Sequence, residues 1–121
     1  MTNEIAIKRA YDPPSPGDGF RVLVDRIWPR GVKREEADID LWLKDVAPST
    51  GLRKWFGHDP EKWPGFGDCY RAELAGNSSF DELLAVARQH KRVTLVFAAR
   101  DAEHNNAVVL QALCKKRLGD A

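Results

Sequence analysis

The sequence predicts an α/β fold: a single three-layer domain over residues 1–121, with a short mixed or parallel sheet of about four strands flanked by helices. Two observations predict it. Short apolar runs rich in β-branched residues alternate along the chain with stretches of helical periodicity, which is the order typical of layered α/β domains. The composition, 43% hydrophobic and 31% charged among 121 residues, is that of a globular protein whose length fits one hydrophobic core.

Four segments have the pattern of strands. Residues 4–8 alternate isoleucine with polar neighbours, and residues 20–27 are rich in the branched apolar side chains that suit a sheet. Residues 39–43 alternate in the same way, after a charged stretch at 33–36 that predicts a short helical turn. Residues 92–99 are almost continuously apolar, which predicts a central strand covered on both faces.

Two helices are predicted in the middle of the chain. The first covers residues 52–57, where Ser49 or Thr50 can cap the free N–H groups of the first turn. The second places apolar side chains of residues 66–74 on one face. We expect it to end at Gly76, because glycine suits a left-handed helix terminus.

Two further helices are predicted on either side of the strand at 92–99. The earlier helix opens with Ser79 and Glu82 in the spacing of a capping box and then shows an apolar stripe. The closing helix follows Asp101, which can cap it, and ends in basic residues that complement the helix dipole. Strands and helices are therefore predicted to alternate along the chain.

Charge, cysteine content and motifs exclude several classes of protein. A formal net charge of +1 leaves attraction to nucleic acid to a local patch, so nucleic-acid binding is not favoured. The chain has no P-loop and no metal-ligand spacing, so we expect no metal and identify no cofactor. Cys69 and Cys114 fall on helix faces and are predicted to be reduced core thiols.

No segment of the sequence directs the chain to a membrane. The N-terminal residues lack the apolar run of a signal peptide, and no stretch reaches the roughly 20 apolar residues that a membrane helix needs. We therefore expect a cytoplasmic protein with no membrane partner. The oligomeric state is left open.

Polar side chains gather where two predicted strands end. Asp25, Arg26, Trp28 and Arg30 follow the strand at 20–27 or end it, and a second set follows the strand at 92–99: Arg100, Asp101, His104 and Asn105. In open α/β sheets, ligands bind in the crevice outside the carboxyl ends of the strands. If the two strands are parallel neighbours, both sets face one cleft; if they are antiparallel, they do not.

The residue types at these strand ends point to an anionic ligand. Guanidinium groups bind phosphate or carboxylate oxygens in a bidentate manner, and we predict four such clamps: Arg26, Arg30, Arg53 and Arg100. Acid or base roles fall to Asp25, Asp101 and His104. The alternative for the aspartates is that they only neutralise the arginines in structural ion pairs.

Two further residues have both a binding and a structural interpretation. Ser49 precedes a predicted helix, where free N–H groups and a hydroxyl suit an anion, but it can equally be a simple helix cap. Trp28 stands among arginines and can form an aromatic wall for a ring to stack on, or can pack in the core. Both residues remain candidates for ligand binding.

Five segments in a distinctive order connect the chain to a known family. They are VDRIWPRG at 24–31, WLKDVAPS at 42–49, LRKWF at 52–56, YRAEL at 70–74 and VTLVFAARD at 93–101, followed by His104 and Asn105. This series resembles the YeaO-like family of uncharacterised bacterial proteins. The resemblance implies a compact cytoplasmic α/β domain of unknown function. It maps the recurrent polar positions of the family onto residues already named, and adds Tyr70 and Glu73. Tyr70 and Asn105 join the candidate ligand-binding residues.

The sequence therefore predicts a small-molecule enzyme or binder whose cleft, lined by arginine and aspartate, holds a phosphorylated or nucleotide-like anion. One alternative is a nucleic-acid or protein interaction module that uses the same basic residues with Trp28. Another is a structural or regulatory domain in which the arginine and aspartate network stabilises the fold.

Overall fold

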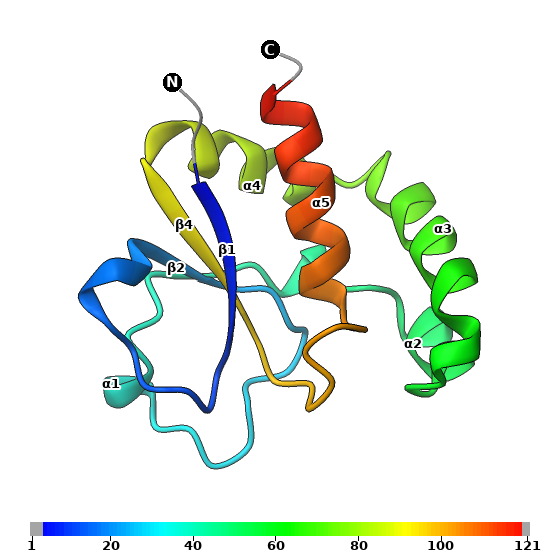
Figure 1. The fold of residues 1–121 in the computed structure, drawn as a ribbon, viewed down its shortest axis with the longest axis horizontal. Coiled ribbons are helices and arrows are strands. Elements are labelled where there is room, and N and C mark those ends of the chain that lie inside the picture. Colours follow the sequence, from blue (N-terminus) through cyan, green and yellow to red (C-terminus); the bar gives the residue numbers. More distant parts are fainter. Residues whose placement is uncertain (1–3, 120–121) are drawn as a thin grey trace.

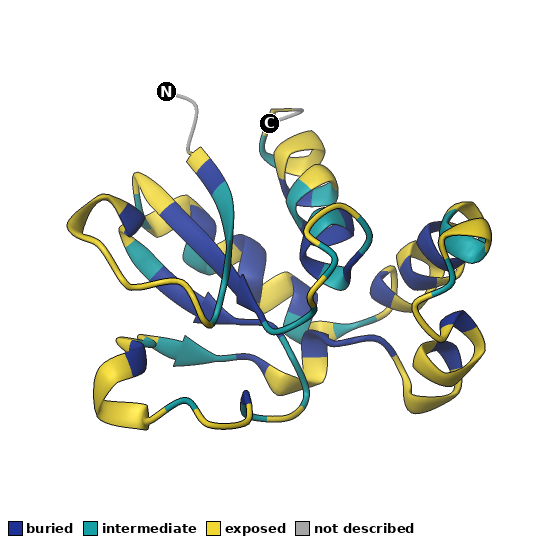
Figure 2. Cartoon of the chain, turned by 60° about the horizontal axis from the view of Figure 1, so that its bottom comes forward, coloured by how far each residue is buried: buried dark blue, intermediate teal, exposed yellow. Residues whose placement is uncertain are grey.

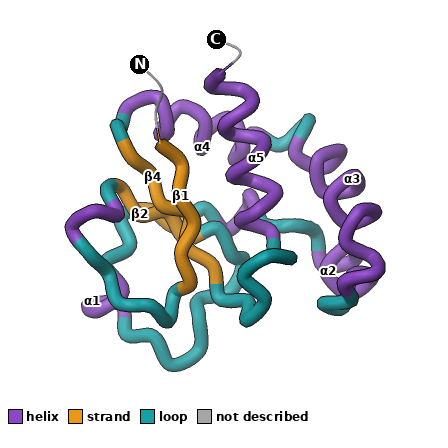
Figure 3. The backbone as a smooth tube through the Cα atoms, viewed as in Figure 1, coloured by secondary structure: helices purple, strands orange, loops and turns teal. Residues whose placement is uncertain are grey.

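The structure is a computed structural model that describes residues 4–119, and at its centre lies a parallel four-stranded sheet (Figures 1 and 3). Its strands are β1 (Glu4–Arg9), β2 (Phe20–Leu23), β3 (Leu41–Trp42) and β4 (Arg92–Phe97), in the order β1-β4-β2-β3. All three pairings, β1 with β4, β4 with β2 and β2 with β3, are parallel. The predicted α/β fold with a short parallel sheet is confirmed.

Strand β2 is shorter than predicted, because a side chain replaces the last backbone pairing with β4. The backbone N–H of Val24 still donates to Val96 O at 3.1 Å. One residue further on, the carboxylate of Asp25 accepts the hydrogen bond of the Ala98 N–H at 2.8 Å. The two strands separate there, and the crevice beyond them begins at Asp25.

Four helices lie on one side of the sheet (Figure 3): α2 (Thr50–Phe56), α3 (Trp63–Leu74), α4 (Ser78–Gln89) and α5 (Asn106–Gly119). Helix α5 packs on β1 and β4, α3 and α4 pack on α5, and α2 packs on α3. The buried residues of Figure 2 lie on the sheet and on the inner sides of these helices. They form a continuous apolar core that runs from Ile5 on β1 to Cys114 on α5.

The other face of the sheet is covered by the short helix α1 (Arg34–Ala37) and by connecting segments. Leu23 and Val96 of the sheet lie beside Ala10, Val32 and Ala37 on this side. This third layer is thin, since α1 has only four residues.

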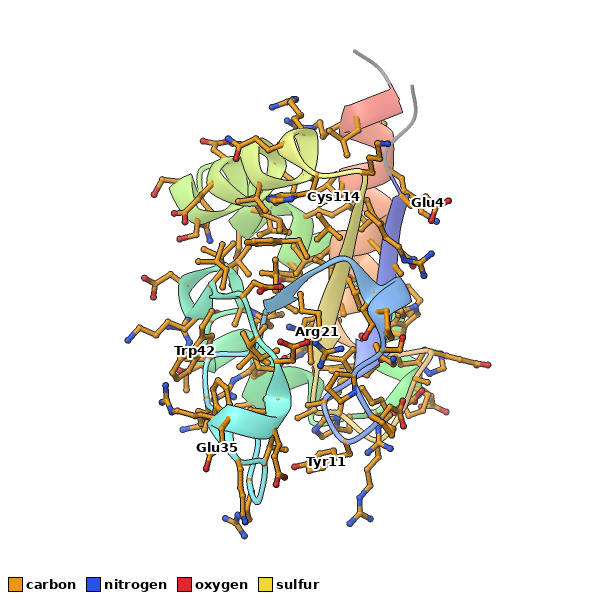
Figure 4. All side chains as sticks on the ribbon, turned by 90° about the vertical axis from the view of Figure 1, so that its left-hand side faces the viewer. Glu4, Tyr11, Arg21, Glu35, Trp42 and Cys114 are labelled. Atoms are coloured by element: carbon orange, nitrogen blue, oxygen red, sulfur yellow. The ribbon has the colours of Figure 1, made fainter. Side chains whose placement is uncertain are left out.

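A buried ion pair lies within this thin layer. The Arg21 guanidinium, 2% exposed, donates to the Asp18 carboxylate at 2.6 Å and to the carbonyls of Ala37 and Asp38. Lys8 and Ser15 also donate to Asp18. Figure 4 shows Arg21 inside the molecule, whereas Tyr11 and Glu35 lie at its periphery. These bonds join β1 and β2 to the loop at 10–19, which the sequence indicates only as a turn-rich connection.

Three predicted helix ends are wrong, and each is corrected by a hydrogen bond or a backbone angle. Asn77, not Ser79, caps α4, because its side chain accepts from the first free N–H groups. At the start of α5, Asn105 Oδ1 accepts from the Val108 N–H, so Asp101 is not the cap. Gly76 has no positive φ, whereas Gly57, at the end of α2, is left-handed.

The two cysteines differ in their environment. Cys114 is fully buried on α5, as predicted, and burial raises the pKa of its thiol to about 12. Cys69 is exposed on α3, so the prediction that it lies in the core is wrong. Cys69 directly precedes the buried Tyr70 in α3, but its own side chain is exposed to solvent.

Across residues 4–119, the helices are all too short or too polar to span a membrane.

Candidate functional site

A cleft of about 840 Å³ opens at the carboxyl ends of β2 and β4. In Figure 1 these strand ends lie low in the view, beside the start of α5 and near α2. The lining comes from four parts of the chain: the segment after β2, the residues around α2, Phe66 of α3, and the segment from β4 into α5. Its members are Asp25, Arg26, Ile27, Trp28, Pro29, Arg30, Ala47, Pro48, Arg53, Lys54, Phe56, His58, Phe66, Ala98, Ala99, Arg100, Asp101, His104, Asn105 and Asn106.

The parallel pairing of β2 with β4 brings the two predicted sets of polar residues together. Asp25 to Arg30 and Arg100 to Asn105 come from opposite ends of the sequence, yet both segments line the cleft. The condition for a shared site, that the two strands run in the same direction, is therefore met.

Asp25 is held rigidly at the point where the strands diverge. Its carboxylate accepts from the Ala98 N–H at 2.8 Å and from the side-chain amide of Asn106 at 3.2 Å, while its carbonyl accepts from the Trp42 indole. Burial raises the pKa of Asp25, although these hydrogen bonds and the charge of Arg53 act in the opposite direction. A partly desolvated carboxylate with a raised pKa is a common feature of functional sites.

Asp101 and His104 form a second polar unit in the lining of the cleft. Asp101 accepts from the backbone N–H groups of Glu103 and His104, and its other oxygen lies 2.8 Å from His104 Nδ1. These hydrogen bonds lower the pKa of Asp101. The carboxylate therefore orients the imidazole, whose ring also meets the Trp63 ring edge-on at 5.1 Å.

The four predicted arginine clamps all line the cleft, and within residues 4–119 none of them forms an ion pair with Asp25 or Asp101. Among residues 4–119, Arg30, Arg53 and Arg100 have no carboxylate within 4.0 Å. Arg26 approaches the exposed carboxylate of Asp45 only to 3.7 Å. The hydrogen bonds of Asp25 and Asp101 go instead to backbone groups, Asn106 and His104.

Arg26 carries a donor that the described part of the chain leaves unsatisfied. Its Nε is buried without a hydrogen-bond partner among residues 4–119, and its NH2 reaches the Ala47 carbonyl only at 3.5 Å. A buried donor without a partner costs about 1–3 kcal/mol, so such groups usually find a ligand or ordered water.

The lining combines positive charge with an apolar wall. The lining contains five basic side chains, those of the four arginines and Lys54, and two carboxylates, so the cleft has an excess of positive charge. Nine of the lining residues are apolar: Ile27, Trp28, Pro29, Ala47, Pro48, Phe56, Phe66, Ala98 and Ala99. Low-dielectric walls of this kind strengthen the field of nearby charges.

Trp28 lines the cleft and also packs against neighbouring side chains. Its ring lines the cleft and is half-buried. At the same time its indole donates to the Val32 carbonyl at 2.7 Å, the Arg34 guanidinium lies 4.6 Å from its centre, and the Trp42 ring meets it edge-on. Much of the ring is therefore engaged in packing.

Two of the predicted ligand-binding residues do not line the cleft. Ser49 caps α2 by accepting from the Leu52 N–H and donates to Glu73 at 2.6 Å. Tyr70 is fully buried and donates its hydroxyl to the Val46 carbonyl. Both tie α3 to the segment before α2, so packing explains these two residues.

Sequence reasoning missed several residues of the cleft. Asn106 holds Asp25 and also donates to the Val24 carbonyl, which joins α5 to the end of β2. Phe56 and Phe66, whose rings stack at 4.5 Å, supply part of the apolar wall. The available signal for Asn106 was its position after the polar run at 100–105; helical spacing gives no sign that the two phenylalanines reach a cleft.

No set of metal ligands is present in the described part of the chain, since no three His, Cys, Asp or Glu side chains are placed to hold an ion. A family model described as the inactive DUF488-N3 subclade, DUF488-N3i, matches residues 4–121. This chain belongs to that subclade. The DUF488-N3i match includes every residue that lines the cleft.

Curated relatives of this DUF488-N3i chain are themselves uncharacterised. It is 41% identical over 106 residues to the uncharacterised protein YeaO of Escherichia coli, a match that covers 88% of this chain and 92% of that protein. It is 39% identical over 113 residues to the uncharacterised protein Rv3073c of Mycobacterium tuberculosis, with 93% and 95% covered. The resemblance to YeaO-like proteins is thus confirmed. No solved structure matches the chain significantly.

Proposed function

We propose that the cleft binds a phosphorylated or nucleotide-like anion. The observation that carries the proposal is the state of the arginines: Arg30, Arg53 and Arg100 lack a carboxylate partner within residues 4–119, and the Nε of Arg26 is buried without an acceptor. A phosphate group offers oxygens that guanidinium groups bind in a bidentate manner.

The apolar wall supports an organic phosphate over an inorganic ion. Ligand pockets are typically lined by apolar and aromatic side chains with a few polar groups that fix orientation. Phe56, Pro48 and Ala99 belong to such a wall beside the arginines. A nucleotide or sugar phosphate has a body for this wall and a charged group for the clamps.

A binding role is favoured over catalysis by the description of the subclade as inactive. Asp25, Asp101 and His104 then serve to shape and polarise the cleft. On this view, Asp101 holds His104 in one orientation at the wall, and Asp25 links the two strand ends where they diverge.

A nucleic-acid interface is the weaker candidate. The indoles of Trp28 and Trp42 both donate to backbone carbonyls, and Arg34 lies over both rings. Rings engaged in this way offer little free surface for stacked bases. Oligonucleotide binding at low salt that falls steeply as salt rises would reverse this preference.

The proposal is tested by calorimetric titration with nucleotides, sugar phosphates and inorganic phosphate. We expect Arg26→Ala to weaken binding of the organic phosphates about tenfold or more, because hydrogen bonds to charged groups are worth about 1.5–3 kcal/mol. The matched control is Arg71→Ala, which removes an exposed arginine paired with Asp68 outside the cleft and leaves affinity unchanged. Failure of every phosphate to bind the wild type contradicts the proposal.

A further inference from the structure

Resting on the proposed function, we infer that Asp25 determines specificity: the cleft selects phosphate esters that also carry a neutral O–H or N–H donor, as sugar phosphates and nucleotides do, and rejects anions without one. Asp25 touches the ligand in this proposal, whereas the arginines hold its phosphate.

The carboxylate of Asp25 has acceptor capacity left after its protein contacts. A carboxylate offers about four lone-pair sites. One oxygen of Asp25 accepts from the Ala98 N–H and the other from the Asn106 amide, and no further donor to this carboxylate occurs among residues 4–119. Asp25 lines the cleft and is half-buried, so its unused lone-pair sites can accept a hydrogen bond from a ligand there.

Asp25 cannot rotate to avoid a ligand. Its two oxygens are fixed from two directions, by the backbone after β4 and by the first residue of α5, and Asn106 is itself anchored on the Val24 carbonyl at 3.0 Å. A ligand in the cleft therefore meets a fixed negative charge.

A fixed carboxylate in a cleft for anions acts in two opposite ways. It repels any anion, and in a partly desolvated site this repulsion is stronger than in water. A ligand that donates a hydrogen bond to the carboxylate offsets the repulsion, and a charge-assisted hydrogen bond is roughly twice as strong as a neutral one. The cleft thus discriminates between anions by repelling those without a donor as well as by attracting those that carry one.

Asp101, the other carboxylate of the cleft, is a natural comparison. It accepts two backbone N–H groups on one oxygen and meets His104 on the other, so its acceptor sites are more fully used. Removal of its charge tests repulsion alone, whereas removal of the Asp25 charge tests repulsion and donor recognition together.

The experiment measures affinity by calorimetry for four probes: inorganic phosphate, phenyl phosphate, ribose 5-phosphate and adenosine 5′-monophosphate. Phenyl phosphate has an apolar ring and no neutral donor. We expect the wild type to bind at least one of the two donor-bearing probes about tenfold or more tightly than phenyl phosphate. A preference shared by ribose 5-phosphate identifies the sugar hydroxyls as the donors, and one confined to the nucleotide identifies the base.

The variant Asp25→Asn is expected to change affinities in opposite directions. Affinity for the preferred donor-bearing probe falls about tenfold, because the charge-assisted bond is lost. Affinity for phenyl phosphate and inorganic phosphate stays the same or rises, because a negative charge is removed. The control Asp101→Asn moves all four affinities together. Thermal melting confirms that both variants are folded.

A purely structural role for Asp25 predicts that Asp25→Asn weakens all four probes by one factor, and that result overturns the inference. Equal affinity of the wild type for phenyl phosphate and the donor-bearing probes overturns it without any variant. In both cases phosphate binding persists, so the proposed function stands. Absence of binding by any probe removes the proposed function and the inference together.

Discussion

Asp18 and Arg21 show how strongly a buried pair depends on both partners. Asp18, 6% exposed, accepts hydrogen bonds from Arg21, Lys8 and Ser15. Burial alone would raise the pKa of Asp18, but these hydrogen bonds outweigh it and hold the pKa well below its usual range. Removal of the carboxylate leaves the Arg21 guanidinium charged, buried and short of an acceptor.

We predict that Asp18→Asn lowers the free energy of unfolding by about 3–5 kcal/mol, the usual cost of breaking a buried ion pair. Urea denaturation of the wild type and the variant measures the difference. The matched control is Asp68→Asn, which breaks the exposed pair with Arg71 and costs less than about 1 kcal/mol. Equal effects of the two substitutions would show that burial of the Asp18 pair is unimportant.

The stabilisation that the Asp18 carboxylate gives the wild type depends on pH, and the sign of this dependence follows from its lowered pKa. The ionised carboxylate stabilises the fold fully above the unfolded pKa, about 3.9. This contribution is lost as the pH falls below that value toward the folded pKa. The difference in unfolding free energy between wild type and Asp18→Asn therefore shrinks from pH 5 toward about pH 2; a difference that is constant with pH contradicts this assignment.

At the scale of single residues, the cleft was predictable where its members follow a strand in the sequence. Asp25, Arg26 and Arg100 were found because they follow or end predicted strands, and ligands in open α/β sheets bind in the crevice outside the carboxyl ends of the strands. Ser49 was assigned to the ligand because it precedes a predicted helix, and Tyr70 because of the family resemblance, but a hydroxyl gives no sign in sequence of whether it bonds to a ligand or to a neighbouring helix.

At the scale of elements, Gly19 sets how closely β2 approaches β4. It has φ of 67°, and a Cβ at this position would lie 2.3 Å from the Arg92 carbonyl oxygen. Any other residue here must adopt a strained backbone and displace the first residue of β4.

We predict that Gly19→Ala destabilises the protein by more than the about 1–2 kcal/mol that a left-handed conformation costs an L-residue. Gly31→Ala isolates that conformational cost, because Gly31 has φ of 79° and open space around it. Gly17→Ala, which meets neither strain nor a neighbour, stays within about 1 kcal/mol of the wild type. Thermal unfolding of the three variants gives the order, and a Gly19→Ala variant no less stable than Gly31→Ala contradicts the close approach.

The elements themselves were largely predictable, and their ends were not. Apolar periodicity located all four strands, because each buries side chains on at least one face. The end of β2 could not be predicted, since Asp25 replaces a backbone partner only when β4 lies beside it. The cap of α4 was misplaced because Asn77 and Ser79 are both good capping residues, and tertiary contact of Asn77 with the Asp45 carbonyl favours the former.

At the scale of the whole molecule, the order of the strands was beyond the reach of sequence patterns. Strand β4 is the last of the four strands in the sequence, yet it lies between β1 and β2 in the sheet. Its pairing with β1 joins residues such as Glu4 and Arg92. Apolar composition predicted that β4 is central, but no local pattern names its neighbours.

Because Cys114 lies on α5 within this central core, its thiol reports opening of the whole fold. We predict that an alkylating reagent modifies the exposed Cys69 in the native protein and modifies Cys114 only at the rate of global unfolding. Mass spectrometry of protein treated at increasing urea concentrations measures both sites. Rapid labelling of Cys114 without denaturant would show that α5 opens independently.

The direction of the parallel strands also determines how the protein can be handled. Strand β1 begins and helix α5 ends at the top of Figure 1, whereas the cleft opens beyond the carboxyl ends of β2 and β4. The described start of β1 and the described end of α5 therefore lie away from the cleft, so a tether, fluorophore or fusion partner attached at either of these points lies remote from it. Immobilisation on a sensor chip through such a tether leaves the cleft facing the flowing solution, ready for screening of phosphate libraries.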